Sequence, residues 1–570
     1  MTAHGGMIKL ILRGSFLGKF IYKVSGGKLL IHKEDHTDYV IPEKYISKQS
    51  LLASKDSSIE KEEEFIGTGS QDGISTTNDL ESKYIIVTWD GEDDPENPNN
   101  WPLPIRIYVS FITGVMSTFT YIASANYTPG LKQLQDEFGI DHTKATLPLS
   151  LFVIGYGIGP MIFSPLSEYK SIGRVRIFII TLAIFSILQI PTALAKNITS
   201  LTILRFIAGI FSSPPLAMGG GVFVDMYSLP YMPVGLALWG IGAYLGVSLG
   251  PVVGAALQVG TNDWRWSFWF LLIVSGALLF LYLTFVPETY HPMILNEKAE
   301  RLRRLTGNPN IIIQEDLNSN HQSISGSLKE ILWRPIEIGI FEPVIMLINI
   351  YISVMYAIMY LWFEAFPYYY GEVREFSIMG SGLTYLSIVI GTLCGALIYI
   401  CLTFKQYTYP LLRKETVHPE AFLPIAILGS ILLPLGIFIF GWSATTTNHW
   451  FGSLIGGAIY GASGIIMFQT LLNYVGMSFF RFVASAFASN AFMRSVVGGC
   501  FPLFGRALFK NLSTKKFPVA WGSTILGVIT FLLISVPVLF YFNGPKLRAT
   551  SKYAGTGDEE VDKQFKNDGH

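Results

Sequence analysis

The sequence has few charged residues, few cysteines and no nucleotide-binding loop. Asp, Glu, Lys and Arg make up 14% of its 570 residues, well below the roughly one quarter that soluble domains carry. Its three cysteines lie in apolar stretches, which supports neither a disulfide framework nor a zinc site, so we expect no metal and no other cofactor. No G-x-x-x-x-G-K-S/T sequence occurs, which argues against ATP as the energy source. The formal net charge is zero, so nothing predicts a nucleic-acid partner.

Long apolar runs are what the sequence does contain. Half of the residues are hydrophobic, and the mean hydropathy is +0.42. From Ile105 onward the runs are about 20 residues long, the length that crosses roughly 30 Å of hydrocarbon as a helix. We therefore predict an all-α integral membrane protein with twelve spans, at 105–128, 145–165, 174–195, 201–223, 232–257, 267–286, 343–366, 378–402, 421–442, 450–474, 483–505 and 519–542.

Polar stretches divide this pattern into five parts. The first 104 residues combine the basic, amphipathic MIKLILRGSFLGKFIYK with the acidic EKEEEF and WDGEDDPENPNNWP, and we expect a largely disordered cytosolic tail. Its basic stretch either lies on a membrane surface or is solvated. The remaining predicted parts are a six-helix bundle at 105–287, a basic central loop at 288–342, a second six-helix bundle at 343–543 and a C-terminal tail at 544–570.

Lys and Arg are concentrated in every second loop between the predicted spans, which predicts that both termini and the central loop are cytosolic. The sequons at Asn197 and Asn511 would then face outward in loops so short that glycosylation is disfavoured. Two sets of six spans suit a transporter built from two repeats, with its site between them, rather than an enzyme.

Glycines recur every four residues in the predicted fifth span, GVSLGPVVGA. Gly246, Gly250 and Gly254 fall on one helix face, where a neighbouring backbone can approach closely, and Pro251 allows a bend. Generic packing of small residues is the alternative reading.

Several motifs together resemble one family. GVSLGPVVGA is similar to the fifth-span antiporter motif of the major facilitator superfamily, and GPMIFSPLSEYKSIGRVR to its motif between spans two and three, with Glu168 where many relatives carry Asp. LTILRFIAGIF resembles its fourth-span motif. The segments WDGEDDPENPNNWP, WRWSFWF and VPETYHPMIL extend the resemblance to the twelve-span drug:proton antiporters of fungi, including yeast benomyl and fluconazole exporters. The second-half stretch YICLTFKQYTYPLLRKE keeps the basic residues of the loop motif without its pattern.

The resemblance implies the major facilitator fold and a latch on the cytosolic side, in which Glu168, Arg174 and Asp225 form a charge cluster. Positive-inside anchoring is the alternative role for these charges. The resemblance also assigns Arg205 to the cavity and to proton coupling, although an arginine near the outer face can instead snorkel. The full set predicted for this latch is Gly159, Glu168, Gly173, Arg174 and Asp225.

Ionisable residues within spans are costly, so each needs a partner or a role. Glu364 is the most deeply placed carboxylate, and it is either a proton-exchange group or a structural hydrogen-bond partner near the outer interface. Arg494 falls near the middle of span eleven, where it requires a partner or a wet cavity. We therefore predict that Glu364, Arg205 and Arg494 take part in proton coupling.

Aromatic and weakly polar residues could form a cavity for varied lipophilic compounds. Each could also face lipid or pack between helices. The predicted set is Tyr121, Asn126, Tyr127, Tyr356, Tyr360, Tyr385, Gln469, Asn473, Phe487 and Asn490.

The function that follows is proton-coupled multidrug efflux, by a monomer in the plasma membrane, with the vacuolar membrane less favoured. Two other functions stay open. One is transport of a specific natural metabolite such as a polyamine, an amino acid or a siderophore. The other is a membrane sensor that has lost transport, which the intact fifth-span motif disfavours.

Overall fold

The structure is a computed structural model that describes residues 3–36, 39, 41–42, 45, 84–318, 324–479, 482–549, 551 and 553–554. It divides into two compact units. A small unit takes in the described parts of 1–105, together with 168–176 and 281–327. A large unit takes in 106–167, 177–280 and the described residues from 328 onward.

The first half of the large unit is helical because apolar runs in hydrocarbon must satisfy their own backbone hydrogen bonds. Local signals end these helices. Asn197 caps α9 by accepting a hydrogen bond from the Ser200 amide at 2.8 Å, and Asn262 ends α11 in the left-handed conformation, at φ 52°. The helices are α5 (Leu103–Ala125), α6 (Leu131–Phe138), α7 (His142–Ser167), α8 (Arg174–Ala193), α9 (Ile198–Ser212), α10 (Pro214–Met226), α11 (Met232–Thr261) and α12 (Trp266–Phe285).

The second half repeats this arrangement of long apolar helices. Its helices are α16 (Pro343–Phe366), α17 (Ile378–Leu383), α18 (Leu386–Thr403), α19 (Tyr409–Leu412), α20 (Leu423–Ser443), α21 (Phe451–Ser478), α22 (Val483–Cys500), α23 (Pro502–Asn511), α24 (Ala520–Leu532) and α25 (Ser535–Ala549).

Among the described residues, eleven helical segments are long and apolar enough to cross a membrane. The predicted eleventh span corresponds to α22 followed by α23, with a break before Pro502. This span contains the polar Asn490 and Arg494, which lower its hydropathy. The prediction of an all-α membrane fold is confirmed.

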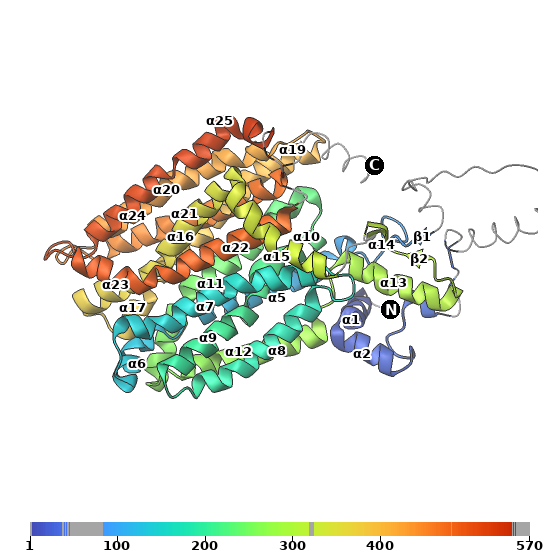
Figure 1. The fold of residues 1–570 in the computed structure, drawn as a ribbon, viewed down its shortest axis with the longest axis horizontal. Helices are drawn as coiled ribbons and strands as arrows, with labels where there is room; N and C mark the ends of the chain where they lie inside the picture. The colour runs from blue at the N-terminus through green and yellow to red at the C-terminus, as the bar shows by residue number, and fades with distance from the viewer. Residues whose placement is uncertain are drawn as a thin grey trace, which may run out of the picture. The chain divides into compact units, whose positions relative to one another are not determined.

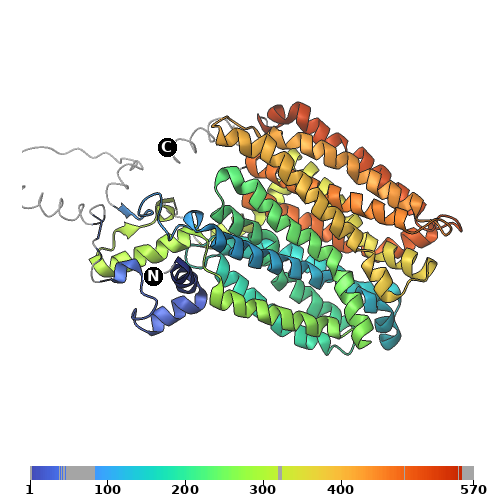
Figure 2. The ribbon, with the colours of Figure 1, turned by 180° about the vertical axis from the view of Figure 1, so that it is seen from behind.

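The two halves of the large unit lie side by side in both views, with the first half drawn in cyan and green and the second in yellow to red (Figures 1 and 2). They meet along several helix pairs, among them α7 with α22 and α11 with α17 and α18. Residues that face this junction are therefore the ones that any movement between the halves would rearrange.

The small unit differs from the expected disordered tail. Its N-terminal residues form α1 (Ala3–Gly14) and α2 (Phe16–Val24), and β1 (Ile85–Ile86) pairs in parallel with β2 (Ile311–Ile312) of the central loop. The loop itself contains α13 (His291–Thr306), α14 (Gln314–Asn318) and the start of α15 (Ile324–Phe341). The acidic stretch EKEEEF lies outside the described residues.

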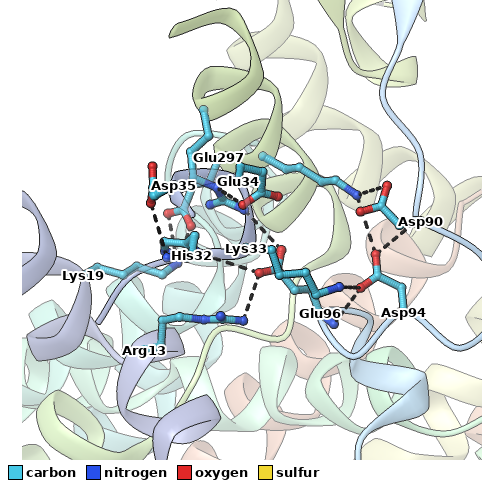
Figure 3. Close-up of polar contacts among 12 residues, drawn as sticks. Arg13, Lys19, His32, Lys33, Glu34, Asp35, Asp90, Asp94, Glu96 and Glu297 are labelled. Carbon is cyan, nitrogen blue, oxygen red and sulfur yellow. Dashed lines mark hydrogen bonds and ion pairs between the residues drawn. The ribbon is translucent and has the colours of Figure 1, made fainter. Parts of the chain in front are cut away.

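Buried ion pairs explain why this polar segment is ordered. Arg301 of α13 binds Glu34 at 3.1 Å and Glu96 at 3.1 Å, and Arg13 binds Glu96 at 3.0 Å (Figure 3). Lys298 binds Asp90 at 2.8 Å. From composition alone these charges are expected to be solvated. Instead, the central loop supplies their partners, 205 residues further along the chain for Glu96 and 267 for Glu34.

Candidate functional site

A closed cavity lies between the two halves of the large unit. Its volume is about 10 Å³, room for about one water molecule, whereas sites for drug-sized ligands measure about 300–1,000 Å³. Helices of both halves supply its wall, and four of its eight lining residues are aromatic. The lining residues are Tyr121, Ala243, Tyr244, Val247, Tyr356, Met359, Phe468 and Arg494.

Arg494 places a cation in this wall, with 3% of the residue exposed. Its guanidinium donates a hydrogen bond to the Tyr121 hydroxyl at 3.3 Å and lies 5.0 Å from the ring of Phe468 and 5.3 Å from that of Tyr356. Its Nε atom has no hydrogen-bond partner, and no carboxylate of the described residues pairs with it. Cation–π contacts offset part of the cost of burial, and unused donors remain beside the cavity.

Buried hydroxyls connect the two halves next to Arg494. Tyr156 of α7 bonds to the hydroxyls of Tyr356 and Tyr360 on α16, the latter at 2.9 Å. Tyr360 in turn donates to the Ser124 hydroxyl of α5 at 3.0 Å. Three hydrogen bonds of this network cross the junction, so separating the halves at this level would break it.

Arg205 is completely buried and does not snorkel. It donates to the carbonyl oxygens of Ala123 at 2.8 Å and Ser124 at 2.9 Å. These carbonyls belong to the last turn of α5, where backbone acceptors lack helical partners and a positive charge is favourable. The guanidinium also lies 4.0 Å from the ring of Phe152. Arg205 therefore reaches the hydroxyl network through Ser124, without lining the cavity.

Glu364 pairs with a residue that the sequence did not single out. Its Oε2 lies 2.6 Å from Nε2 of His142, the first residue of α7, and Thr146 donates to its Oε1 at 3.4 Å. Glu364 is 4% exposed. This contact joins the end of α16 to the start of α7, across the two halves. The sequence feature that could have identified this partner is a histidine at the start of a predicted span, near the expected membrane depth of Glu364.

Both ends of the cavity are closed. Toward the end predicted to face outward, a Cβ added to Gly382 of α17 would lie 2.5 Å from the Ala255 Cβ of α11, so these backbones touch closely. Toward the predicted cytosolic end, Thr408 donates to the Pro230 carbonyl at 2.9 Å, and Gln469 to that of Leu236 at 3.0 Å. The two halves are therefore in contact on both sides of the cavity in this structure.

The glycine ladder of α11 packs against α5. A Cβ at Gly246 would overlap the Thr118 carbonyl oxygen, and one at Gly254 the Asn126 carbonyl oxygen. At Gly250 the nearest atom, the Ala125 Cβ, would be 3.2 Å away. Pro251 is buried in the same helix. Close helix approach thus requires glycine most strictly at the two ends of the motif.

The loop motif of the small unit is shaped by Glu288, which follows α12. Its carboxylate accepts hydrogen bonds from the amides of Arg174 at 3.2 Å and Val175 at 3.1 Å, at the start of α8. Gly173 has φ +71°, and a Cβ there would lie 2.6 Å from Glu288 Oε2. Burial raises the pKa of Glu288, although the amides oppose this.

The other residues predicted for the cytosolic latch are divided between the small and the large unit. The Arg174 guanidinium lies 5.2 Å from the ring of Tyr290, and the Glu168 carbonyl accepts from the Tyr290 hydroxyl at 2.7 Å. Asp225 lies at the end of α10 in the large unit, so the charge cluster stays a prediction. In the large unit, a Cβ at Gly159 would overlap the Ser213 hydroxyl, which brings α7 close to α10.

Tyr121 and Tyr356 are the predicted cavity residues that lie on the wall, and Tyr360 is one hydrogen bond away. The others mainly join helices. Wall residues that the sequence analysis missed include Tyr244, Met359 and Phe468, because composition does not tell which face of a span turns inward. The hydrogen bonds of the predicted cavity residues that do not line the wall are Asn126 to Ser267 at 2.8 Å, Tyr127 to Ala145 at 3.2 Å, Tyr385 to Trp362 at 3.2 Å, Gln469 to Leu236 at 3.0 Å, Asn473 to Tyr399 at 3.0 Å and Asn490 to Asn349 at 3.0 Å. Phe487 is half-buried.

Comparisons with known proteins agree with this geometry. The Major Facilitator Superfamily pattern matches residues 113–502. A cycloheximide resistance protein of Candida maltosa is 49% identical over 95% of this chain and 99% of its own. Fluconazole resistance protein 1 of Saccharomyces cerevisiae is 40% identical over 82% of this chain and 84% of its own. The xylose transporter XylE of E. coli shares the fold, with a TM-score of 0.52 and 16% identity over 77% of this chain and 99% of its own. The chain therefore belongs to the Major Facilitator Superfamily and, within it, to the family of these fungal resistance transporters.

Proposed function

We propose that this protein exports varied lipophilic compounds across the plasma membrane in exchange for protons, acting as a monomer by alternating access. The observation that carries this proposal is the aromatic cavity around Arg494, which is closed at both ends and shared by the two halves. The relatives support export of toxic compounds, since two of them are named for resistance to cycloheximide and fluconazole.

The moving parts in this proposal are the predicted bundles at 105–287 and 343–543. In an alternating cycle the cavity widens as one end opens, and the aromatic side chains then contact the compound. The hydroxyl network between Tyr156, Tyr360 and Ser124 breaks and re-forms with each cycle. The cytosolic latch of Glu168, Arg174 and Asp225 is part of the same proposal, as an interaction that holds one of the open states.

Proton coupling is proposed at Glu364 and His142. Their contact joins α16 to α7 and exists while that end of the cavity is closed. Opening this end separates the carboxylate from the imidazole, so proton binding and closure influence each other, as linkage requires. Arg205 and Arg494 contribute through the hydroxyl network and the cavity wall.

Arg494 also argues against one alternative, transport of a polyamine. A cationic substrate in the cavity would be repelled by the buried Arg494 guanidinium. No carboxylate of the described residues pairs with Arg494, so none lies beside it to bind such a substrate. An amino acid or siderophore offers hydrogen-bond acceptors and is not disfavoured on this ground.

The experiment is transport in sealed vesicles that contain the purified protein and a panel of fluorescent lipophilic compounds. An imposed proton gradient should drive accumulation, and a protonophore should abolish it. Accumulation that follows ATP and ignores the gradient would reject proton coupling. A response confined to one natural metabolite would favour the specific transporter instead.

A further inference from the structure

An open cleft of about 770 Å³ lies between α2 and α13 in the small unit. Five cationic and three carboxylate side chains line it, which leaves a surplus of two positive charges. Several of these charges neutralise one another. Glu297 binds Lys19 at 2.8 Å and Arg176 at 3.3 Å, and Asp35 accepts a hydrogen bond from Tyr22 at 2.6 Å. Arg301 is held by Glu34 and Glu96.

Lys23 and Arg304 differ from these paired groups. Both line the cleft and are exposed. No ion pair joins either of them to another residue in the described part of the small unit. Their charges are therefore available to an anion that enters from solvent, and Glu300 and Asp35 are the opposing carboxylates that line the cleft.

The exposed face of α2 beside this cleft is apolar. Phe16 is 40% exposed, Phe20 58% and Val24 71%. Their spacing of four residues places them on one face of the helix. On the opposite side Gly18 is buried, and a Cβ there would overlap the Leu12 carbonyl oxygen of α1. The exposed apolar face is thus not the one with which α2 packs on its own unit.

Lysines occupy the flank between the apolar face and the cleft. Lys19 and Lys23 are four residues apart and both line the cleft. A helix that exposes large apolar side chains next to lysines has the pattern of one that lies at a membrane surface, with the apolar groups in the interface and the cations at the phosphates.

We propose that α2 and the cleft beside it bind the anionic phospholipid headgroups of the cytosolic leaflet. Lys23 and Arg304 contact lipid phosphate and carboxylate groups, while Phe16, Phe20 and Val24 insert at the edge of the acyl chains. The small unit includes the first residues of α5, up to Ile105, so the same chain continues from this unit directly into the first predicted span. This site is independent of the transport cavity.

Spin labelling of the full-length protein tests the proposal. Cys394, Cys401 and Cys500 are replaced by alanine, and a nitroxide is attached at Phe20→Cys or, as a control on the same unit, at the exposed position of His36→Cys. The protein is placed in nanodiscs of phosphatidylcholine alone or with about one third phosphatidylserine. Collisions with oxygen, which concentrates in the bilayer, are compared with collisions with a water-soluble nickel complex.

We expect the label at position 20 to be shielded from nickel and accessible to oxygen when phosphatidylserine is present, whereas position 36 stays in water. Each basic residue near an anionic surface is worth about fivefold in binding, so Lys23→Gln with Arg304→Gln should weaken docking by roughly 30-fold. High salt should act in the same direction. Both variants replace exposed side chains and leave the buried ion pairs intact.

Two results would overturn the proposal. Equal nickel access at positions 20 and 36 in both lipids would show that α2 stays in water. Shielding at position 20 that is the same with and without phosphatidylserine, and the same in the Lys23→Gln, Arg304→Gln variant, would show that α2 is shielded from water without recognising anionic headgroups. The assay needs no transport, so failure of the efflux proposal would not change its outcome.

Discussion

His142 Nε2 lies 2.6 Å from Glu364 Oε2, a contact between the first residue of α7 and the last turn of α16. The two residues are 222 positions apart in the chain. Their contact joins the halves at one end of the junction, and it combines a carboxylate and an imidazole, two side-chain types that serve as proton donors and acceptors in proteins.

The first prediction concerns this pair. Glu364→Gln removes the exchangeable proton but keeps the shape of the side chain, so gradient-driven accumulation of a fluorescent compound should fall to background. Exchange of labelled for unlabelled compound without a gradient should continue, because the cavity wall is unchanged. Both are measured in the same vesicles. Thr146→Val is the matched control, since it removes the 3.4 Å contact to the carboxylate and the 3.0 Å bond to the His142 carbonyl but keeps both ionisable side chains. Full gradient-driven transport by Glu364→Gln would move proton coupling elsewhere.

The second prediction concerns recognition by Arg494. A hydrogen bond to a charged group is worth about 1.5–3 kcal/mol, so Arg494→Met should lower affinity for uncharged compounds rich in hydrogen-bond acceptors by about 10- to 100-fold. Fluorescence titration of the detergent-solubilised protein measures this. Arg506→Met is the control, because Arg506 is a partly exposed arginine of α23 that pairs with Glu372. Unchanged affinity in Arg494→Met would mean that its donors do not reach the compound.

The third prediction ranks the glycines of α11. Gly246→Ala places a methyl group against the Thr118 carbonyl of α5, and Gly254→Ala against the Asn126 carbonyl just after α5; each should destabilise the protein by about 1–3 kcal/mol. Gly250→Ala should be milder, since its nearest atom would be 3.2 Å away. Thermal unfolding in detergent gives the order.

Gly276→Ala on α12 is the control for this series, because a Cβ there meets nothing within 4 Å. It should be neutral or stabilise by up to about 1 kcal/mol, as alanine favours a helix over glycine. If Gly254→Ala unfolds at the same temperature as Gly276→Ala, the close approach of α11 to α5 is not needed for stability.

The fourth prediction is acid sensitivity of the small unit. Burial raises the pKa of Glu96, but the His32 imidazole at 3.5 Å and the charges of Arg301 and Arg13 outweigh it and hold the pKa well below its usual range. A depressed carboxyl pKa stabilises the folded state above the unfolded pKa of about 4.3 and loses this contribution as the pH falls below it.

Hydrogen exchange of α13 amides in nanodiscs, corrected for intrinsic rates, measures this effect. Protection should be constant from about pH 7 to 5 and fall below about pH 4. Glu96→Gln should start from lower protection and lose part of the pH dependence. Protection in the natural protein that is unchanged down to pH 3 would show that this carboxylate does not support the unit.

The apolar runs by themselves determined the class of fold, because the cost of exposing a backbone to hydrocarbon is local and can be summed over about 20 residues. Arg494 and Glu364 also stood out in the sequence, since a charge within a span is costly wherever its partners lie. The glycine spacing indicated close packing, although not that α5 is the helix that approaches Gly246 and Gly254.

Only the tertiary structure decided which of these groups meet. Arg494 reaches Tyr121 across 373 positions of the chain, and Arg301 orders the acidic N-terminal segment through Glu34 and Glu96. Hydropathy and periodicity depend on each residue and its near neighbours. The partner of a buried charge depends instead on which helix faces meet after packing, and no local pattern carries that information.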